Sequence, residues 1–172
     1  MGGIGPSAAL LAFFLSGSVL SSLPAERRRG GPLLLKKELA GGYARNWKQV
    51  LANGGLPVSA IIAARLIPSH ELLFLHAYFG SVAAACADSW GTEIGTRFGT
   101  RVQDVMTGLE LPSGLSGGVS LLGMAGSIGG AMLIALAAMS SPFFAAKPWA
   151  LAAIVIAGLF GAIADSILGS TV

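Results

Sequence analysis

The sequence predicts an all-α fold, a polytopic transmembrane helix bundle of about five helices that forms a single integral-membrane domain over residues 1–172. Only 11% of the residues are charged and 53% are hydrophobic, with a mean hydropathy of +0.73, whereas soluble domains carry roughly 25% charged residues. A chain with so little charge cannot cover a surface that faces water, which indicates that it lies in lipid. The 25 glycines are typical of membrane helices that pack closely.

Five apolar segments form this predicted bundle, and each approaches the ~20 residues that a spanning helix needs. They lie near residues 6–23, 51–68, 71–88, 117–142 and 148–170. The first has no basic stretch before it, which favours a retained helix over a cleaved signal peptide. The fourth contains Gly126 and Gly130, a GxxxG pair suited to close helix packing. Glycine faces of this kind also suit a homodimer.

Basic residues predict the orientation of the bundle. Nine of the 11 lie in two loops, the basic loop 24–50 and the loop that contains Arg97 and Arg101. The positive-inside rule places both loops in the cytoplasm and the N-terminus outside. The third and fifth segments then both run toward the cytoplasm, so Asp88 and Asp165 lie at cytoplasmic helix ends, where they can meet.

Several classes of site are not expected. Cys86 is the only cysteine, so an intramolecular disulfide and a cysteine-based zinc site are excluded. The chain shows neither a Ser/His/Asp set nor paired histidines. Its basic residues lie beside membrane segments without a recognition motif, so nucleic acid is not an expected partner.

A polar stretch before the second segment reads "GYARNWKQVLANGG". On a helix, Arg45, Gln49 and Asn53 recur every four residues and form one polar face. This face suits phosphate oxygens, with Asn46 and Lys48 beside it, or hydrogen bonds to neighbouring helices.

The stretch "ADSWGTEIGTRFG" follows the third segment. Asp88 and Thr92 share a helix face, and acids at membrane depth are costly unless they have a partner or a function. Asp88 suits a hard cation such as Mg²⁺, which takes one or two carboxylates together with substrate phosphates. The alternative is a salt bridge from Asp88 or Glu93 to Arg45 or Arg97.

Two further polar stretches are predicted on the same side. A Gly/Ser loop with Ser116, Gly117 and Gly118 opens the fourth segment, where free backbone N–H groups and the helix dipole favour an anion. The stretch "GAIADSILGS" carries Asp165 and Ser166 near the end of the chain. Two acids at one depth indicate a shared metal, and a structural hydrogen bond from Asp165 to Ser89 or Asn53 is the alternative.

Together these four stretches resemble the integral-membrane family that includes plant phytyl-phosphate kinase and animal transmembrane protein 19. The resemblance runs from about Phe13 to the C-terminus and is carried by "RNWKQVLANGG", "ADSWGTEIG", "PSGLSGGVSLLG" and "GAIADSILGS". The pattern "D-S-x-G-T-x-x-G" is also similar, more distantly, to the nucleotide-binding signature of CTP-dependent lipid kinases and CDP-diacylglycerol synthases.

The resemblance implies transfer of a phosphoryl group from a nucleoside triphosphate, with CTP expected, to an isoprenyl monophosphate such as phytyl phosphate in the membrane. It implies Mg²⁺ held by Asp88 and Asp165, with Thr92 and Glu93 in support. It also implies phosphate groups held by a larger set of residues: Arg45, Asn46, Lys48, Gln49, Asn53, Ser116, Gly117, Gly118 and Ser166.

Three other functions are alternatives. A cytidylyltransferase-like enzyme would transfer CMP instead of phosphate. A transporter would use Asp88 and Asp165 to bind a cation or a proton, but the outer half of the bundle is nearly free of polar residues. A non-catalytic scaffold would leave both "ADS" stretches unexplained.

Overall fold

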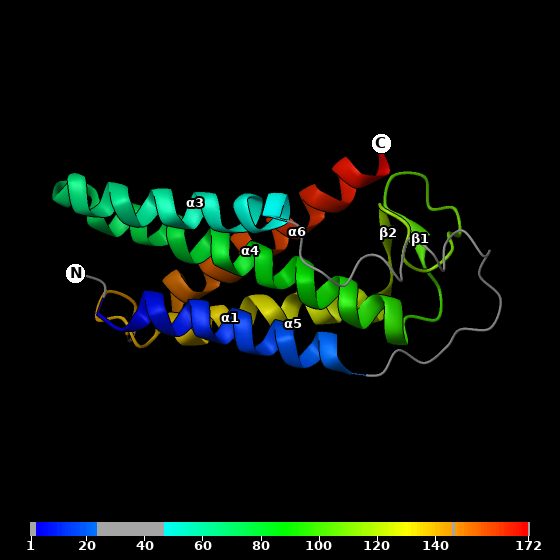
Figure 1. The fold of residues 1–172 in the computed structure, drawn as a ribbon, viewed down its shortest axis with the longest axis horizontal. Coiled ribbons are helices and arrows are strands. Elements are labelled where there is room, and N and C mark those ends of the chain that lie inside the picture. The colour runs from blue at the N-terminus through cyan, green and yellow to red at the C-terminus, as the bar shows by residue number, and fades with distance from the viewer. Residues whose placement is uncertain (1–2, 24–46, 146, 172) are drawn as a thin grey trace.

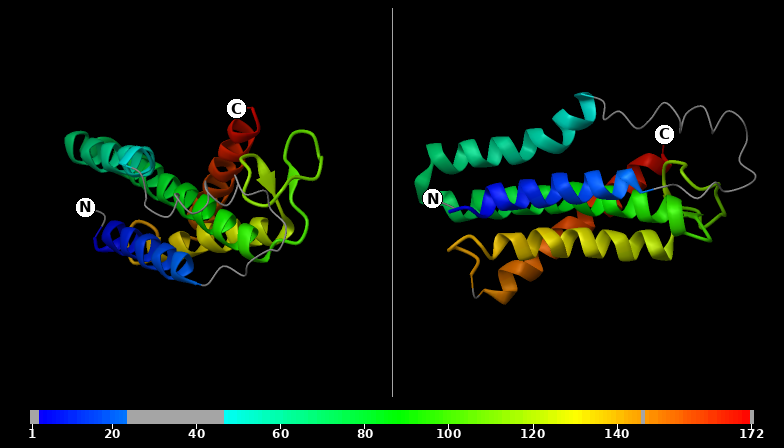
Figure 2. Two further views of the ribbon diagram at one scale, coloured as in Figure 1. Left: turned by 45° about the vertical axis from the view of Figure 1, so that its right-hand side comes forward. Right: turned by 60° about the horizontal axis from the view of Figure 1, so that its bottom comes forward.

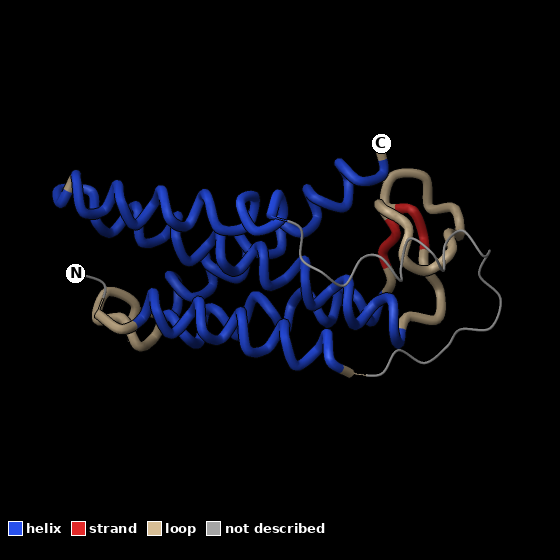
Figure 3. Tube along the Cα trace, viewed as in Figure 1, coloured by secondary structure: helices blue, strands red, loops and turns tan. Residues whose placement is uncertain are grey.

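The computed structural model describes residues 3–23, 47–145 and 147–171. These residues form five long helices, a short 3₁₀ helix and a two-stranded sheet, so the predicted all-α bundle is confirmed (Figures 1 and 3). The elements are α1 (Gly5–Ser22), α3 (Trp47–Leu66), η1 (Pro68–His70), α4 (Glu71–Phe98), β1 (Gln103–Asp104), β2 (Gly118–Val119), α5 (Leu121–Ala138) and α6 (Pro148–Ser170).

Helix α4 lies at the centre of the bundle and packs against α1, α3, α5 and α6 (Figure 2). The largest fully buried side chains include Tyr78 and Phe79 of α4, together with Ile134 and Phe144. Large apolar side chains also cover the outside of the bundle; Phe160, for example, is 70% exposed. A protein surrounded by water would bury such side chains in its core, so these outer faces suit contact with lipid.

Four of the described helical segments are long and apolar enough to cross a membrane: α1, η1 with α4, α5 and α6. Helix α3, which contains the second predicted segment, is not among them. It begins at Trp47, before the expected start, and its first two turns carry Lys48, Gln49 and Asn53. These polar residues lower its hydropathy, although it lies alongside α4 (Figure 1).

Helix α4 extends beyond the predicted third segment, which ends at residue 88. Asp88 therefore lies ten residues before the helix end at Phe98, and its prediction as a helix-end residue is wrong. Falling hydropathy marks the edge of a membrane span, but it does not end a helix. The ion pair between Glu93 and Arg97, four residues apart and 2.9 Å long, supports the polar extension.

The GxxxG pair of α5 packs against α4, as the sequence predicts. A Cβ atom on Gly130 would lie 2.7 Å from the carbonyl oxygen of Cys86, and one on Gly126 would lie 2.9 Å from that of Trp90. Only glycine permits this backbone approach. Because α4 already covers these two positions, the predicted homodimer cannot form through this glycine pair.

The fourth predicted segment, 117–142, is shortened at both ends. Helix α5 spans only Leu121–Ala138, because Gly118 and Val119 form strand β2 instead of a first helical turn. This strand pairs antiparallel with β1, so that Gln103 lies opposite Val119. The resulting hairpin, residues 103–119, was not predicted.

Candidate functional site

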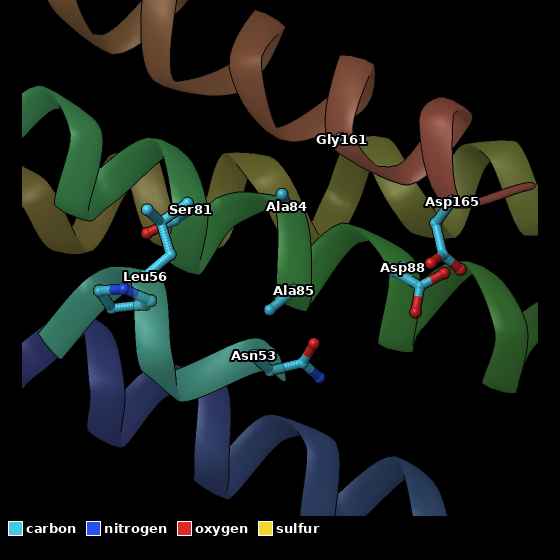
Figure 4. Close-up of a pocket in the computed structure, with 9 residues that line it drawn as sticks. Asn53, Leu56, Ser81, Ala84, Ala85, Asp88, Gly161 and Asp165 are labelled. Atoms are coloured by element: carbon cyan, nitrogen blue, oxygen red, sulfur yellow. The ribbon is translucent and has the colours of Figure 1, made fainter. Parts of the chain in front are cut away.

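Asp88 of α4 and Asp165 of α6 face each other, as Figure 4 shows. The two helices run in the same direction (Figure 1) and pack closely where Gly161 meets Ala84. One turn later, the two carboxyl groups lie next to each other. The predicted meeting of the two aspartates is confirmed. Two adjacent carboxylates repel each other, so this arrangement favours a cation between them.

Two cavities lie on either side of this aspartate pair, and both aspartates line both of them. The larger cavity, of about 620 Å³, lies between α4, α5, α6 and the hairpin. The smaller, of about 190 Å³, lies between α3, α4 and α6. Only the larger falls within the ~300–1,000 Å³ that is typical of small-molecule sites.

The larger cavity collects most of the predicted site residues that the structure describes. Its lining includes Asp88, Asp165, Thr92, Glu93, Ser116, Gly117, Gly118 and Ser166. Further hydroxyl groups come from four residues that were not assigned to the site: Thr96, Ser113, Ser120 and Ser127. Among the described lining residues, three are acidic and none is basic. This wall offers many hydrogen bonds and a negative charge.

Glu93 forms the salt bridge that the sequence offers as the alternative to a role at the metal. Its carboxylate pairs with Arg97 and also accepts a hydrogen bond of 2.9 Å from the Ser21 hydroxyl. The buried guanidinium of Arg97 donates further bonds to the carbonyls of Leu20, Ser21 and Leu23, at the C-terminal end of α1. In the described part of the chain, no three His, Cys, Asp or Glu side chains converge as metal ligands. The predicted salt bridge from Glu93 to Arg97 is confirmed, and the support that Glu93 is expected to give a metal at Asp88 and Asp165 stays a prediction.

The Gly/Ser loop lines the cavity but does not begin a helix. Ser120 caps α5, and its hydroxyl accepts a hydrogen bond of 3.1 Å from the Gly123 N–H. One of the backbone N–H groups that were expected to bind an anion at the start of the helix is thus already hydrogen-bonded within the chain. Gly117 has a φ of +79°, and a Cβ there would lie 2.6 Å from Ser170. The loop consequently packs against the last turn of α6.

Asp104 anchors the hairpin to α6 and was missed in the sequence. One carboxylate oxygen accepts a hydrogen bond of 2.7 Å from the Ser170 hydroxyl. The other accepts bonds from the backbone N–H groups of Met106 and Thr107, at 3.0 and 2.7 Å. These bonds, that of Ser170 foremost, lower the pKa of Asp104. The run from Asp104 to Gly108, which has a φ of +70°, has the residue types of an Asx turn, and this signal was present in the sequence.

The predicted phosphate-binding face on α3 is described at one position only. Asn53 lines the smaller cavity, and in Figure 4 it lies on the side of α3 nearest the aspartates. Lys48 and Gln49 lie in the first turn of α3, but their side chains are outside the description. Arg45 and Asn46 lie outside the described residues altogether.

Comparison with known proteins finds relatives in a plant and an archaeon. The chain is 28% identical over 186 aligned positions to Protein PGR of Arabidopsis thaliana, covering 96% of this chain and 63% of the relative. It is 28% identical over 127 positions to the uncharacterized membrane protein MJ0933 of Methanocaldococcus jannaschii, covering 74% of this chain and 49% of the relative. The chain thus spans about half to two thirds of the length of these relatives.

No solved structure matches the chain. The family model described as "Integral membrane protein DUF92" matches residues 1–172, the whole of the sequence. This match agrees with the apolar helices and with the family resemblance of the four polar stretches. The chain therefore belongs to the DUF92 family of integral membrane proteins.

Proposed function

We propose that this protein is a membrane-embedded phosphotransferase that moves the terminal phosphoryl group of a nucleoside triphosphate, CTP above all, to an isoprenyl monophosphate such as phytyl phosphate. The observation that carries the proposal is the aspartate pair between two cavities. A two-substrate transfer needs two binding spaces that meet at one point, and Asp88 and Asp165 stand at such a point.

The donor set at this point fits Mg²⁺. Two carboxyl groups face each other, and the Thr92 and Ser166 hydroxyl groups belong to the wall of the larger cavity. Mg²⁺ prefers oxygen ligands and is bound by one or two carboxylates together with substrate phosphates. When bound, the ion would neutralise negative charge on the transferring phosphoryl group. Asp88 and Asp165 would hold it, while hydroxyl groups of the wall donate hydrogen bonds to the nucleotide phosphates.

The proposed reaction needs no catalytic base. The monophosphate acceptor is largely ionised at neutral pH, so one of its oxygens attacks the terminal phosphorus directly. The bond from that phosphorus to the bridging oxygen breaks, which yields a nucleoside diphosphate and an isoprenyl diphosphate. Phosphoryl transfer of this kind depends mainly on positioning and charge neutralisation.

In this proposal, Arg45 and Lys48 supply the positive charge that binds the phosphates. The described lining of the larger cavity contains no basic side chain, and Arg97 is bound to the end of α1. A triphosphate beside three acidic residues requires cations. Lys48, in the first turn of α3, and Arg45, just before the helix, are the basic residues nearest in sequence to Asn53, which lines the smaller cavity.

The test supplies phytyl phosphate and CTP labelled either at the α or at the γ phosphate, with and without Mg²⁺. Label from the γ phosphate should enter the lipid only when Mg²⁺ is present. Asp88→Asn and Asp165→Asn should each slow transfer roughly 100-fold, because loss of a metal ligand removes about 3 kcal/mol of transition-state stabilisation.

Glu110→Gln is the matched control, since this acid is exposed on the hairpin and lines neither cavity. It should retain the parent rate. Label from the α phosphate in the lipid would instead establish a cytidylyltransferase and overturn the kinase proposal.

A cation transporter is the second candidate, favoured by the acidic lining of the larger cavity. It predicts that neither label enters the lipid and that the protein does not bind CTP. Reconstituted liposomes should then show a cation or proton flux that Asp88→Asn abolishes.

A further inference from the structure

The smaller cavity is polar at the aspartates and mainly apolar beyond them (Figure 4). Ser81 also lines the mainly apolar part, but its hydroxyl donates a hydrogen bond of 2.8 Å to the Tyr78 carbonyl. Its polar end is formed by Asn53 and the two aspartates. From there it continues between α3 and α4, past Ala85 and Leu56. Leu56 lines the cavity and is 63% exposed. An amphiphile with a polar head and an apolar chain matches this distribution.

Asn53 offers this polar end two kinds of group. Its side-chain amide can donate hydrogen bonds to an anion. In addition, Pro57 lies four residues later in α3 and has no N–H to donate to the Asn53 carbonyl. The second group is therefore the backbone carbonyl oxygen of Asn53, which lacks its helical hydrogen bond and lies beside the aspartates.

The size of the cavity limits what it can hold. At about 190 Å³ it lies below the ~300 Å³ minimum typical of pockets that enclose a whole small molecule. A nucleotide suits the larger cavity better. The smaller one has room for a headgroup and the start of a chain, provided that the rest of the chain leaves through an opening.

The helix arrangement provides an opening toward lipid. Helix α3 packs on α4, and α6 packs on α4 and α5, so that α3 and α6 flank α4 along this cleft. Apolar side chains at the cleft and on the neighbouring outer faces, such as Leu56 and Phe160, are exposed. The bilayer is the medium into which an apolar chain would emerge here.

On the basis of the proposed phosphotransferase function, we infer that this cleft is the acceptor site. The phosphate of an isoprenyl monophosphate lies beside Asn53 and the aspartate pair, and its first isoprene unit lies on Ala84 and Ala85. The chain leaves past Leu56 between α3 and α6. The nucleotide occupies the larger cavity on the other side of the aspartates.

The first test places bulk in the cleft with Leu56→Trp. Its matched control is Ile62→Trp, at a position on α3 that is 53% exposed and lines neither cavity. Leu56→Trp should raise the KM for phytyl phosphate about tenfold, which corresponds to ~1.4 kcal/mol. The KM values for CTP and for dimethylallyl phosphate, whose chain is one isoprene unit, should stay close to the parent values.

Ile62→Trp should change none of these constants. The acceptor-site proposal is overturned if Leu56→Trp affects phytyl phosphate no more than Ile62→Trp does. It is also overturned if the loss is the same for both chain lengths, since that result would show general damage to the site.

A second test does not require turnover. A phytyl phosphate analogue with a diazirine on its chain is photolysed with the full chain in liposomes, and the labelled peptides are identified by mass spectrometry. The acceptor site is supported if residues 53–57 and 81–85 are labelled and an excess of phytyl phosphate prevents this labelling. Labels elsewhere, or none, overturn it. Labelling of the cleft in a protein without phosphoryl transfer would keep the acceptor site and overturn the kinase.

Discussion

Acidic residues that lie close together in this sequence have different structural roles, which residue type alone does not predict. Asp88 and Asp165 face each other between two cavities. Glu93, only five residues after Asp88, is paired with Arg97, which in turn binds the carbonyl groups at the end of α1. Free carbonyls at a helix end are satisfied in this way by a buried cation. Glu93 and Arg97 thus join α1 to α4, while the aspartates form the candidate site.

Asp104 provides a prediction at the residue scale. The Ser170 hydroxyl is the main cause of its lowered pKa. Because the folded-state pKa is lowered, its hydrogen bonds stabilise the folded hairpin above the ordinary carboxyl pKa of about 3.9. This contribution is lost as the pH falls through the lowered value.

Ser170→Ala should therefore raise the pKa of Asp104 toward its ordinary value and weaken the contact between the hairpin and α6. Carbon-detected NMR titration of Asp104 in detergent micelles measures the shift. Ser140→Ala, at an exposed serine beyond the other end of α5, is the control and should leave the titration unchanged. An unaltered Asp104 titration in Ser170→Ala would show that this contact does not form.

At the scale of elements, close helix contacts hold the site. Glycines of α5 allow α4 to approach, and Gly161 of α6 allows the approach that brings Asp165 to Asp88. The hairpin then covers the larger cavity from the end of the bundle. These contacts determine the separation of the helices and hence the room for substrates.

Glycine substitutions test this role of helix contacts. Gly130→Ala should lower the free energy of unfolding by about 1–3 kcal/mol, because its Cβ would lie 2.7 Å from a backbone oxygen and the helices must move apart. Gly54→Ala meets no atom within 4 Å, so it should be neutral or stabilise by up to ~1 kcal/mol through helix propensity. Unfolding in denaturant, followed by circular dichroism, compares the two. Equal effects would contradict close packing at Gly130.

On the scale of the whole molecule, the bundle has two distinct ends. The hairpin, the end of α6 and the aspartates lie toward one end, whereas η1 and the connection from α5 to α6 lie at the other (Figure 1). Arg101 belongs to the first end, and Arg65 and Lys147 belong to the second. The positive-inside rule, applied to all 11 basic residues of the sequence, predicts that the end with the candidate site faces the cytoplasm.

Orientation is testable with single cysteines in a Cys86→Ala background. Leu109→Cys lies on the exposed hairpin, and Ser69→Cys lies in η1 at the opposite end. A maleimide that does not cross membranes should label Ser69→Cys in intact cells, but Leu109→Cys only after the membrane is opened. The reverse pattern would place the candidate site outside the cytoplasm.

The sequence by itself determined the membrane class and the approximate positions of the five described long helices. It also determined that Asp88 and Asp165 lie toward the same end, because helices separated by an even number of crossings run in the same direction. These properties depend on hydropathy and chain order, which are local or one-dimensional. The GxxxG contact was predictable for the same reason, since both glycines lie on one helix face.

Only the tertiary structure decided how the site is built. The hydrogen bond from Ser21 to Glu93, the anchoring of Asp104 by Ser170 and the two cavities all depend on residues far apart in the chain. The length of α4 also escaped prediction, because a helix can continue beyond the apolar stretch that would span a bilayer. Hydropathy measures preference for lipid, whereas pairing and cavity shape follow from how whole helices pack, which no single segment encodes.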